Sequence, residues 1–302
     1  MNIYSTITER VLKQMEQGVI PWHKTWRAGL PKNTVSGKEY RGVNILVLGL
    51  ADHASRYWLT YRQALQLGGH VRKGERSTPV IYWKWRTPEE IAKRAAATGN
   101  EEIAPCVPFV SAVFNLDQTE GVPPPADDIQ HRPEDRLKAA DQMLDVMPDK
   151  PEIVHAVTAN PVYSPGLDRV TLPHLSQFES ADDYYSVLFH ELVHSSGHPR
   201  RLNRFAETEG DQAEKYSFEE LVAEFGAAFL CGFAGIENGK THAQQASYIE
   251  AWARVFRQDS RILVRAASAA QRAADYIRGK TAAENVSITA SEAQAEEVVS
   301  HA

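Results

Sequence analysis

The chain has 302 residues, enough for two domains that each bury a hydrophobic core. Its composition, 43% hydrophobic and 24% charged, is that of a globular protein, and no apolar run approaches the roughly 18 residues of a membrane span. Two cysteines without paired spacing exclude a disulfide framework and a cysteine zinc ribbon. Because the first residues also lack the pattern of a signal peptide, we expect a cytoplasmic protein.

The net charge of −6 is unevenly distributed along the chain. Residues 1–100 carry 16 lysines and arginines against 7 acidic residues, a net of +9, and the remaining 202 residues carry a net of −15. Five of the six tryptophans also lie before residue 100. This division predicts two differently built domains, of which the first meets a polyanion.

The first domain is predicted to mix helices and strands. Apolar residues at helical spacing predict an opening amphipathic helix over residues 3–17, and a short helix over 61–67 should stop at Gly68-Gly69. Residues 78–85 and 109–116 are rich in β-branched and aromatic residues and are predicted to be strands.

Basic and aromatic side chains alternate through this first domain. Exposed rings can stack on unpaired bases while cations neutralise phosphates, so the mixture is typical of proteins that bind single-stranded DNA. The candidate DNA-binding residues are Trp22, Lys24, Trp26, Tyr40, Arg41, Trp58, Tyr61, Arg72, Lys73, Arg76, Trp83 and Lys84. In the alternative interpretation, the rings belong to the core and the cations to a solvated surface.

Several segments, in order along the chain, resemble the N-terminal domain of the ArdC antirestriction proteins, to which a domain of plasmid TraC-type primases is related. They are residues 21–26, Asn33, 40–44, 58–64, 67–75 and 113–118. The resemblance covers residues 1–120 and implies sequence-tolerant binding of single-stranded DNA. Because no primase region accompanies it, we do not expect DNA synthesis.

A linker is predicted between the two domains. Residues 119–135 are acidic and rich in proline, which favours an extended spacer. We therefore predict a DNA-binding domain over residues 1–125, a linker region over 126–149 and a second domain over 150–280. The last residues, 281–302, are rich in Ala, Glu and Ser and are predicted to be a flexible tail.

The strongest local motif is His190-Glu191-Leu-Val-His194. A helix capped by Ser180 places His190 and His194 one turn apart on the same face, where two imidazoles can bind one metal ion. Glu191, beside them, is the candidate catalytic residue, because it can take a proton from a water that the metal activates. The alternative is a chance pair of histidines on a core helix.

A catalytic zinc site also needs a third protein ligand and an open position. Metzincins place a histidine ten residues after the first one, and Arg200 occupies that position here, so this is not a metzincin. His198 follows Gly197, which should end the helix. We therefore expect His198 to support the structure or a ligand rather than to bind metal.

The next helix, predicted from Ser217 to about Gly232, supplies the third ligand. Glu220 and Glu224 lie one turn apart on a stripe with small apolar residues, and burying two acids there without a cation is unfavourable. We predict that Glu220 binds the metal and that Glu224 hydrogen-bonds a histidine ligand. Glu224 or Glu219 are alternative ligands, and Ser217 with Glu220 also fits a capping box.

This second part resembles the zincin-like domain of the same family, in which the arrangement Glu-x-x-Ala-Glu is similar to that of gluzincin-like enzymes. The similar segments are residues 163–168, 172–173, 190–198, 201–204, 219–224, 247–252 and 270–276. In zincins a strand ahead of the helix aligns the substrate, and residues 154–157 and 170–172 are the candidates. Tyr163, Tyr184 and His198 are candidate donors to an oxyanion.

Together these features predict an α+β protein with a mixed α/β module for single-stranded DNA and a gluzincin-type metallopeptidase domain. The resemblance implies protection of incoming single-stranded DNA during conjugation, and a host protein such as a restriction-system subunit as a possible substrate. The expected cofactor is Zn²⁺, although imidazole and carboxylate ligands also admit Mn²⁺, Co²⁺ or Ni²⁺. No membrane partner is expected.

Two alternatives remain open from the sequence. In the first, the chain is a non-enzymatic DNA-binding protein with a structural metal site; Glu191 argues against it, since a structural site needs no general base. In the second, the metal serves a nuclease, but nuclease sites usually recruit two metal ions and more carboxylates.

Overall fold

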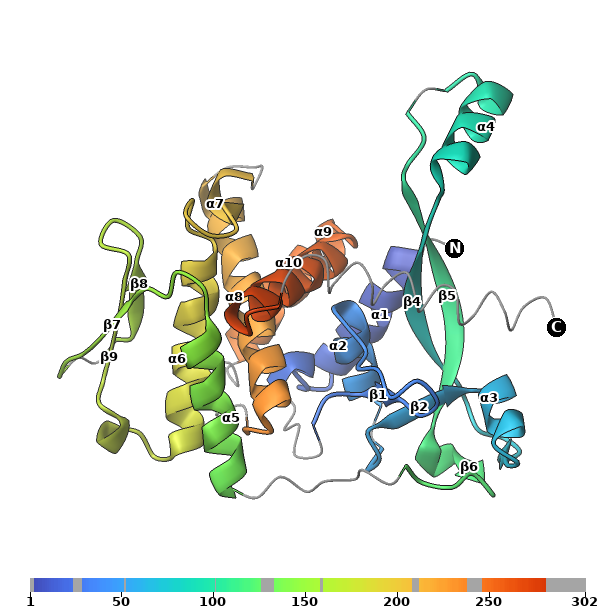
Figure 1. Ribbon diagram of the computed structural model, residues 1–302, viewed down its shortest axis with the longest axis horizontal. Coiled ribbons are helices and arrows are strands. Elements are labelled where there is room, and N and C mark those ends of the chain that lie inside the picture. The colour runs from blue at the N-terminus through green and yellow to red at the C-terminus, as the bar shows by residue number, and fades with distance from the viewer. Residues whose placement is uncertain are drawn as a thin grey trace.

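The computed structural model of the chain describes residues 3–23, 29–51, 53–100, 102–125, 133–157, 160–207, 212–237 and 246–280. It mixes helices and sheets, as the predicted α+β class requires (Figure 1). Among the described residues, no helix is both long enough and apolar enough to cross a membrane.

The N-terminal half contains a four-stranded sheet in the order β1-β2-β5-β4, in which only the β1–β2 pair is parallel. Its strands are β1 (Lys32–Asn33), β2 (Tyr57–Thr60), β4 (Thr78–Trp85) and β5 (Cys106–Asn115). A second, two-stranded sheet pairs β3 (His70–Val71) with β6 (Thr119–Glu120). The predicted strand over 78–85 is confirmed, and the one over 109–116 begins three residues earlier than expected.

The helices of this half lie along the sheet and beyond its end. They are α1 (Ile3–Met15), the short 3-10 helix η1 (Pro21–His23), α2 (Val43–Gly49), α3 (Tyr61–Gln66), α4 (Pro88–Thr98) and the 3-10 helix η2 (Leu116–Gln118). The predicted helices over 3–17 and 61–67 are confirmed. A capping box of Thr60 and Gln63 starts α3 directly after β2. Helix α4 stands at the tip of the long β4–β5 hairpin (Figure 1).

The C-terminal half places a three-stranded sheet, in the order β7-β9-β8, against a group of helices. The strands are β7 (Glu152–His155), β8 (Val162–Ser164) and β9 (Arg169–Leu172). The helices are α5 (Pro133–Val146), η3 (Leu175–Gln177), α6 (Ala181–Ser196), α7 (Arg204–Glu207), α8 (Gln212–Ala234), α9 (Ala246–Gln258) and α10 (Ile262–Ile277). As predicted, Ser180 caps α6 by accepting a hydrogen bond from the Asp183 amide.

Most of the predicted linker is not a linker. Residues 133–146 form α5, which buries Ala140 and Met143, and the following Met147 is buried as well. The proline-rich composition ahead of this helix hid an apolar pattern with a spacing of three to four residues. Residues 126–132 and the predicted tail over 281–302 lie outside the described residues.

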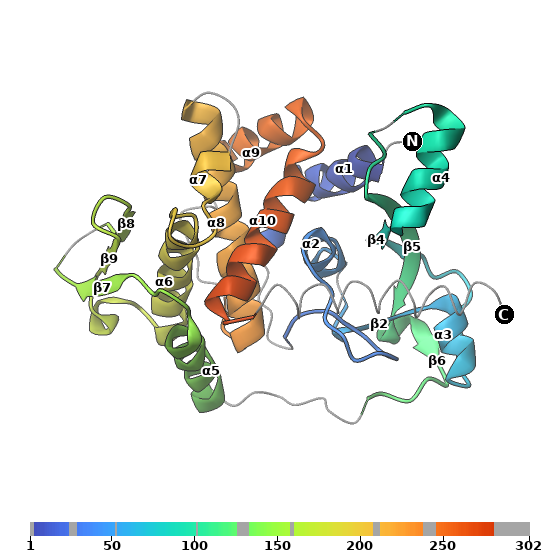
Figure 2. The same cartoon turned by 45° about the horizontal axis from the view of Figure 1, so that its top comes forward.

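One hydrophobic core runs through both halves. Ile7, Val11 and Met15 of α1 belong to the same buried cluster as the inward faces of α6, α8 and α10. Trp22 lies between the rings of Phe225 and Phe256, whose centroids are 4.9 and 6.2 Å from its own. In Figure 2, α1 and α2 lie beside the C-terminal helices α9 and α10. The two predicted domains therefore share a packed interface.

Candidate metal centre

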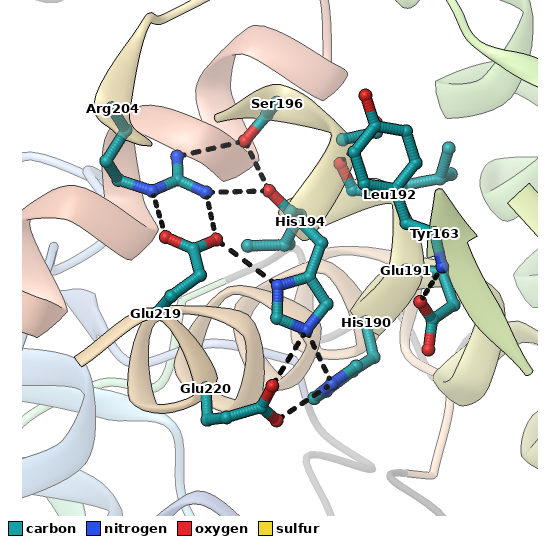
Figure 3. A network of polar contacts seen from close by, with 11 residues as sticks. Tyr163, His190, Glu191, Leu192, His194, Ser196, Arg204, Glu219 and Glu220 are labelled. Atoms are coloured by element: carbon teal, nitrogen blue, oxygen red, sulfur yellow. Dashed lines mark hydrogen bonds and ion pairs between the residues drawn. The ribbon is translucent and has the colours of Figure 1, made fainter. Parts of the chain in front are cut away.

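The centre is built on α6, the helix of the His-Glu-x-x-His motif. His190 and His194 lie one turn apart, and their Nε2 atoms approach to 3.1 Å (Figure 3). At this distance one ring can donate its N–H to the lone pair of the other. The same two nitrogens can instead direct both lone pairs at a single cation, so their approach also fits a shared metal ion.

Glu220 of α8 completes the group from the neighbouring helix. Its carboxylate oxygens lie 3.5 Å from His194 Nε2 and 3.7 Å from His190 Nε2. One ligand atom from each of the three side chains lies within 4.8 Å of the others, the only such group among the described residues. Because α8 begins at Gln212, Ser217 is inside the helix, and the capping-box alternative for Glu220 does not hold.

The charges around His190 favour a cation at this point. Burial opposes the protonated ring, but the hydrogen bond to Glu220 and the charges of Glu224, Glu191 and Glu220 outweigh it and raise the pKa of His190. For Glu220, the two histidines likewise outweigh burial, so its pKa is lowered.

Glu219 holds His194 from the other side. Its Oε1 lies 3.2 Å from His194 Nδ1, and Arg204 donates to both of its oxygens at 2.7 and 2.8 Å. Arg204 also donates to Ser196 Oγ and to the Val193 carbonyl at the end of α6 (Figure 3). The sequence predicted a hydrogen bond from Glu224 to a histidine ligand, and the structure shows such a contact for Glu219. The charge of Glu224 contributes to the raised pKa of His190.

Glu191 lies beside the two histidines and is buried. Its Oε2 accepts a hydrogen bond of 2.6 Å from the Tyr163 amide of β8, which leaves its other oxygen without this contact. Strand β8 is thus the strand that meets the motif. Of the two segments that the sequence named for substrate alignment, residues 170–172 lie in β9, the central strand of its sheet, which has no free edge. Residues 154 and 155 end β7, an edge strand of that sheet, so its alignment of a substrate stays a prediction.

The three candidate oxyanion donors have other partners. The Tyr163 hydroxyl donates to Asp168, and burial together with this bond raises the pKa of Tyr163 to about 12. The Tyr184 hydroxyl lies 2.9 Å from His155 Nε2. His198 does not join the metal group; its Nδ1 accepts from the Arg200 amide in the loop after α6.

The sequence analysis did not identify Tyr216 as a neighbour of the predicted metal ligand Glu220. It is exposed and lies one turn before Glu220 on α8, and the Glu220 charge is the main cause of its raised pKa. The four-residue spacing was the available signal, since residues i and i+4 share a helix face.

The predicted DNA-binding residues are divided between core and surface. Trp22, Tyr40 and Trp58 are only 0%, 5% and 2% exposed, so their rings cannot stack on a base in this structure. Arg41 pairs with Asp275 of α10 and so ties the two halves together. For these four residues the core or structural interpretation fits better.

The other candidates remain accessible. Tyr61, Arg72, Lys73 and Arg76 are exposed, and Arg72 also pairs with Glu75; Trp83 and Lys84 of β4 are partly exposed. Lys24 and Trp26 lie outside the described residues. On the same hairpin the structure exposes two further rings, Trp85 on the face of Trp83 and Phe109, which pairs with Tyr82 on the opposite face, at 55% and 52%.

Known proteins match both halves of the chain. Residues 1–114 match the family model of the N-terminal domain of the anti-restriction factor ArdC, and residues 139–269 match that of a zincin-like metallopeptidase. Crystal structures of the antirestriction ArdC protein from the R388 plasmid, metal-free and Mn(II)-bound, superpose with TM-scores of 0.73 and 0.72. Both are 32% identical to this chain and cover 92% of it and 97% of their own length.

Two curated relatives are similar over almost the whole chain. The protein y4eC of Sinorhizobium fredii (strain NBRC 101917 / NGR234) is 33% identical, and the match covers 92% of each chain. A DNA primase TraC of Escherichia coli is 32% identical over 91% of this chain. The chain spans only 27% of the length of that primase.

Proposed function

Because this chain belongs to the ArdC family of antirestriction proteins, we propose that it binds single-stranded DNA and protects incoming DNA during conjugation. We further propose that its zincin-like half hydrolyses peptide bonds with a divalent metal ion, Zn²⁺ in the first instance. Its place of action would be the cytoplasm.

One observation carries the proposal of a catalytic metal centre. The ligand atoms of His190, His194 and Glu220 converge, and Glu191 lies beside them with one oxygen held by a backbone amide. A structural metal site usually has four protein ligands, whereas a catalytic site has three and an open position. Three protein ligands next to a buried carboxylate therefore favour catalysis.

Each residue of the proposed site has a separate role. When bound, a divalent ion would polarise the scissile carbonyl and lower the pKa of a water molecule. Glu191 is positioned to accept the proton of that water, while the Tyr163 amide fixes the orientation of its carboxylate. Glu219, held by Arg204, keeps the His194 ring in place.

The experiment for this half is a comparison of Glu191→Ala with Glu250→Ala, an exposed glutamate of α9. Glu191→Ala should keep its metal content and melting temperature and lose proteolysis of host restriction subunits, since a general base contributes to the transition state but not to holding the ion. Glu250→Ala should behave as wild type. Retained proteolysis in Glu191→Ala, or loss of its metal, would contradict the assignment.

The DNA half of the proposal is supported by the net of +9 in residues 1–100 and by the exposed rings of the β4–β5 hairpin. The whole chain should bind a labelled single-stranded oligonucleotide and prefer it to duplex DNA, and its binding affinity should fall steeply as the salt concentration rises. If no binding to single-stranded DNA is measured at low salt, the proposed DNA binding is wrong, and the proposed peptidase activity is not affected.

A further inference from the structure

A cavity of about 650 Å³ lies between the two halves of the molecule. This volume falls in the range of roughly 300–1,000 Å³ that is typical of ligand sites. Tyr4 of α1 and Trp83 of β4 line it from the N-terminal half, and Phe218 of α8 together with one side of α10 lines it from the C-terminal half. In Figure 2, α1 and the β4–β5 hairpin lie on the same side of α10.

The α10 side of the cavity is cationic. Within residues 261–275 of the chain, the exposed positions are Arg261, Arg265, Ser268 and Arg272, and all four line the cavity. Their spacing of four, three and four residues places them in one stripe along α10. Among the described residues that line the cavity none is acidic, although the C-terminal 202 residues carry a net charge of −15. The arginine stripe therefore opposes the charge of its own half.

Aromatic rings face these cations. The Arg261 guanidinium lies 5.9 Å from the centre of the Tyr4 ring, and that of Arg265 lies 5.7 Å from the centre of the Phe218 ring. Trp85 follows Trp83 by two residues on β4, so both rings point to the same face, and Trp85 is well exposed. The aromatic surface therefore continues from the cavity along the hairpin.

We propose that this cavity binds single-stranded DNA, with phosphates along the α10 arginines and bases against Trp83 and the neighbouring rings. Cations that follow a backbone, together with rings that stack on bases, are the elements of a single-strand site. From Arg261 to Arg272 the helix rises about 16 Å, at roughly 1.5 Å per residue. A stacked strand that advances roughly 3.4 Å per nucleotide would place several phosphates along that length.

The inference rests on the proposed DNA binding but changes its location. Charge and aromatic content assign DNA contacts to residues 1–125 alone, whereas the cavity adds α10 of the zincin-like half. A strand in this cavity would contact both halves at once.

The test uses the full chain and a fluorescent single-stranded oligonucleotide. The double variant Arg261→Ala/Arg265→Ala should bind at least ten-fold more weakly at low salt. The slope of log K against log salt should fall by about 0.7 for each lost phosphate contact. Arg265→Lys keeps the cation and should retain most of the affinity. We leave Arg204 unchanged, because it also holds Glu219.

The matched control is Arg169→Ala/Arg200→Ala, which removes one half-buried and one exposed arginine around the β7–β9 sheet, on the other side of α6 from α10 (Figure 1). It changes the net charge equally and should bind as wild type does. For the rings, Trp83→Leu should weaken binding about ten-fold and Trp83→Phe should restore most of it, a readout that a loss of fold would not produce.

The outcomes separate the two proposals. If wild type binds single strands and the α10 variant matches the arginine control, the cavity assignment is wrong and the DNA-binding proposal stands. An equal loss of duplex or RNA binding in the α10 variant would overturn the single-stranded DNA assignment in favour of a general polyanion site. If wild type does not bind single strands at all, the proposed DNA function fails and this inference fails with it.

Discussion

At the scale of single residues, His194 is held at both ring nitrogens. Glu219 lies at Nδ1, and Glu220 and His190 lie near Nε2. An acceptor at Nδ1 favours the tautomer with the proton on that nitrogen, which leaves the Nε2 lone pair for a metal ion. Because Arg204 fixes Glu219 with two hydrogen bonds, this orientation does not depend on the metal. The ring is thus prepared for ligation before an ion arrives.

The third ligand can be tested by comparing two glutamates one turn apart on α8. Glu220→Ala should lose most of the bound metal, since it removes one of three ligands. Glu224→Ala should lose less, because Glu224 is not part of the group of converging ligand atoms found among the described residues. Metal content by mass spectrometry and titration with Zn²⁺ and Mn²⁺ measure both. The reverse order would reassign the ligand, and Glu214→Ala on the exposed start of α8 is the control.

Sequence reasoning predicted the motif on α6 but not all of its partners. Helical spacing alone places His190, Glu191 and His194 together, because they are on one helix. Glu219 and Glu220 are adjacent on α8, and their side chains point about 100° apart. The angle at which α8 crosses α6 therefore decides which of the two contacts the metal and which contacts His194 Nδ1. That crossing is a tertiary property, which local spacing does not contain.

At the scale of elements, the close approach of α6 and α8 depends on Gly226. A Cβ atom at Gly226 would lie 2.6 Å from Val193 Cγ2, well inside van der Waals contact. Val193 is buried and precedes His194 directly. The same contact therefore sets the distance between the helix with the histidines and the helix with Glu220.

Gly226→Ala should lower both stability and metal affinity. Helix propensity favours alanine by about 1 kcal/mol, but overpacking a core costs about 1–3 kcal/mol and would move Val193 and His194 away from α8. Thermal melts and metal titration measure the two effects. Adding Val193→Ala makes room and should restore part of the metal affinity, and Gly166→Ala, which meets nothing within 4 Å, should change neither. Full metal affinity in Gly226→Ala alone would refute this account.

A second link joins the end of α6 to the β8–β9 turn. The buried Arg201 side chain donates to both oxygens of Asp168 at 2.8 and 2.9 Å, to the Ser195 carbonyl and to the Asp149 carbonyl after α5. Tyr163, whose amide holds Glu191, donates its hydroxyl to the same Asp168. This cluster positions the strand β8 that contacts the catalytic candidate.

The Asp168 link predicts a loss of stability in acid. Hydrogen bonds from Arg201 outweigh burial and, with the bond from Tyr163, hold the pKa of Asp168 below its ordinary value. Ionised Asp168 therefore contributes its full stabilisation above about pH 4, which is its pKa in the unfolded chain. This stabilisation is lost as the pH falls through the lower pKa of Asp168 in the folded protein. Asp168→Asn should lose about 2–3 kcal/mol at neutral pH and show less acid dependence, measured by urea unfolding between pH 3 and 7. Asp145→Asn, on the exposed side of α5, should keep the wild-type pH profile.

At the scale of the whole molecule, the division of charge and tryptophan predicted two domains, and two different family models match the chain, over residues 1–114 and 139–269. The shared core was not predicted. The sequence predicts that helix α1 is amphipathic, but it does not predict what the apolar face contacts. In the structure α1 packs against α9 and not against the four-stranded sheet of the N-terminal half. The sequence analysis also predicted that Trp22 binds DNA, because the sequence does not show that the rings of Phe225 and Phe256 lie around it in the fold.

The shared core predicts that the N-terminal half is not stable alone. A fragment of residues 1–125 would expose Ile7, Val11, Met15 and Trp22, which the full chain buries completely or almost so. At about 1.5–3 kcal/mol for each large side chain, the lost burial is comparable to the entire stability of a small domain.

We therefore expect the fragment to be largely unfolded and to bind DNA poorly, and the full chain to melt in one calorimetric transition. Trp22→Ala should lower the stability of the full chain by about 3–5 kcal/mol, since it empties the junction of the two halves. Trp85→Ala removes an exposed ring and should leave the melt unchanged while weakening DNA binding. Two separate melting transitions, or a folded and fully active fragment, would show that the halves are independent; in that case the cavity between them could not form part of one DNA site.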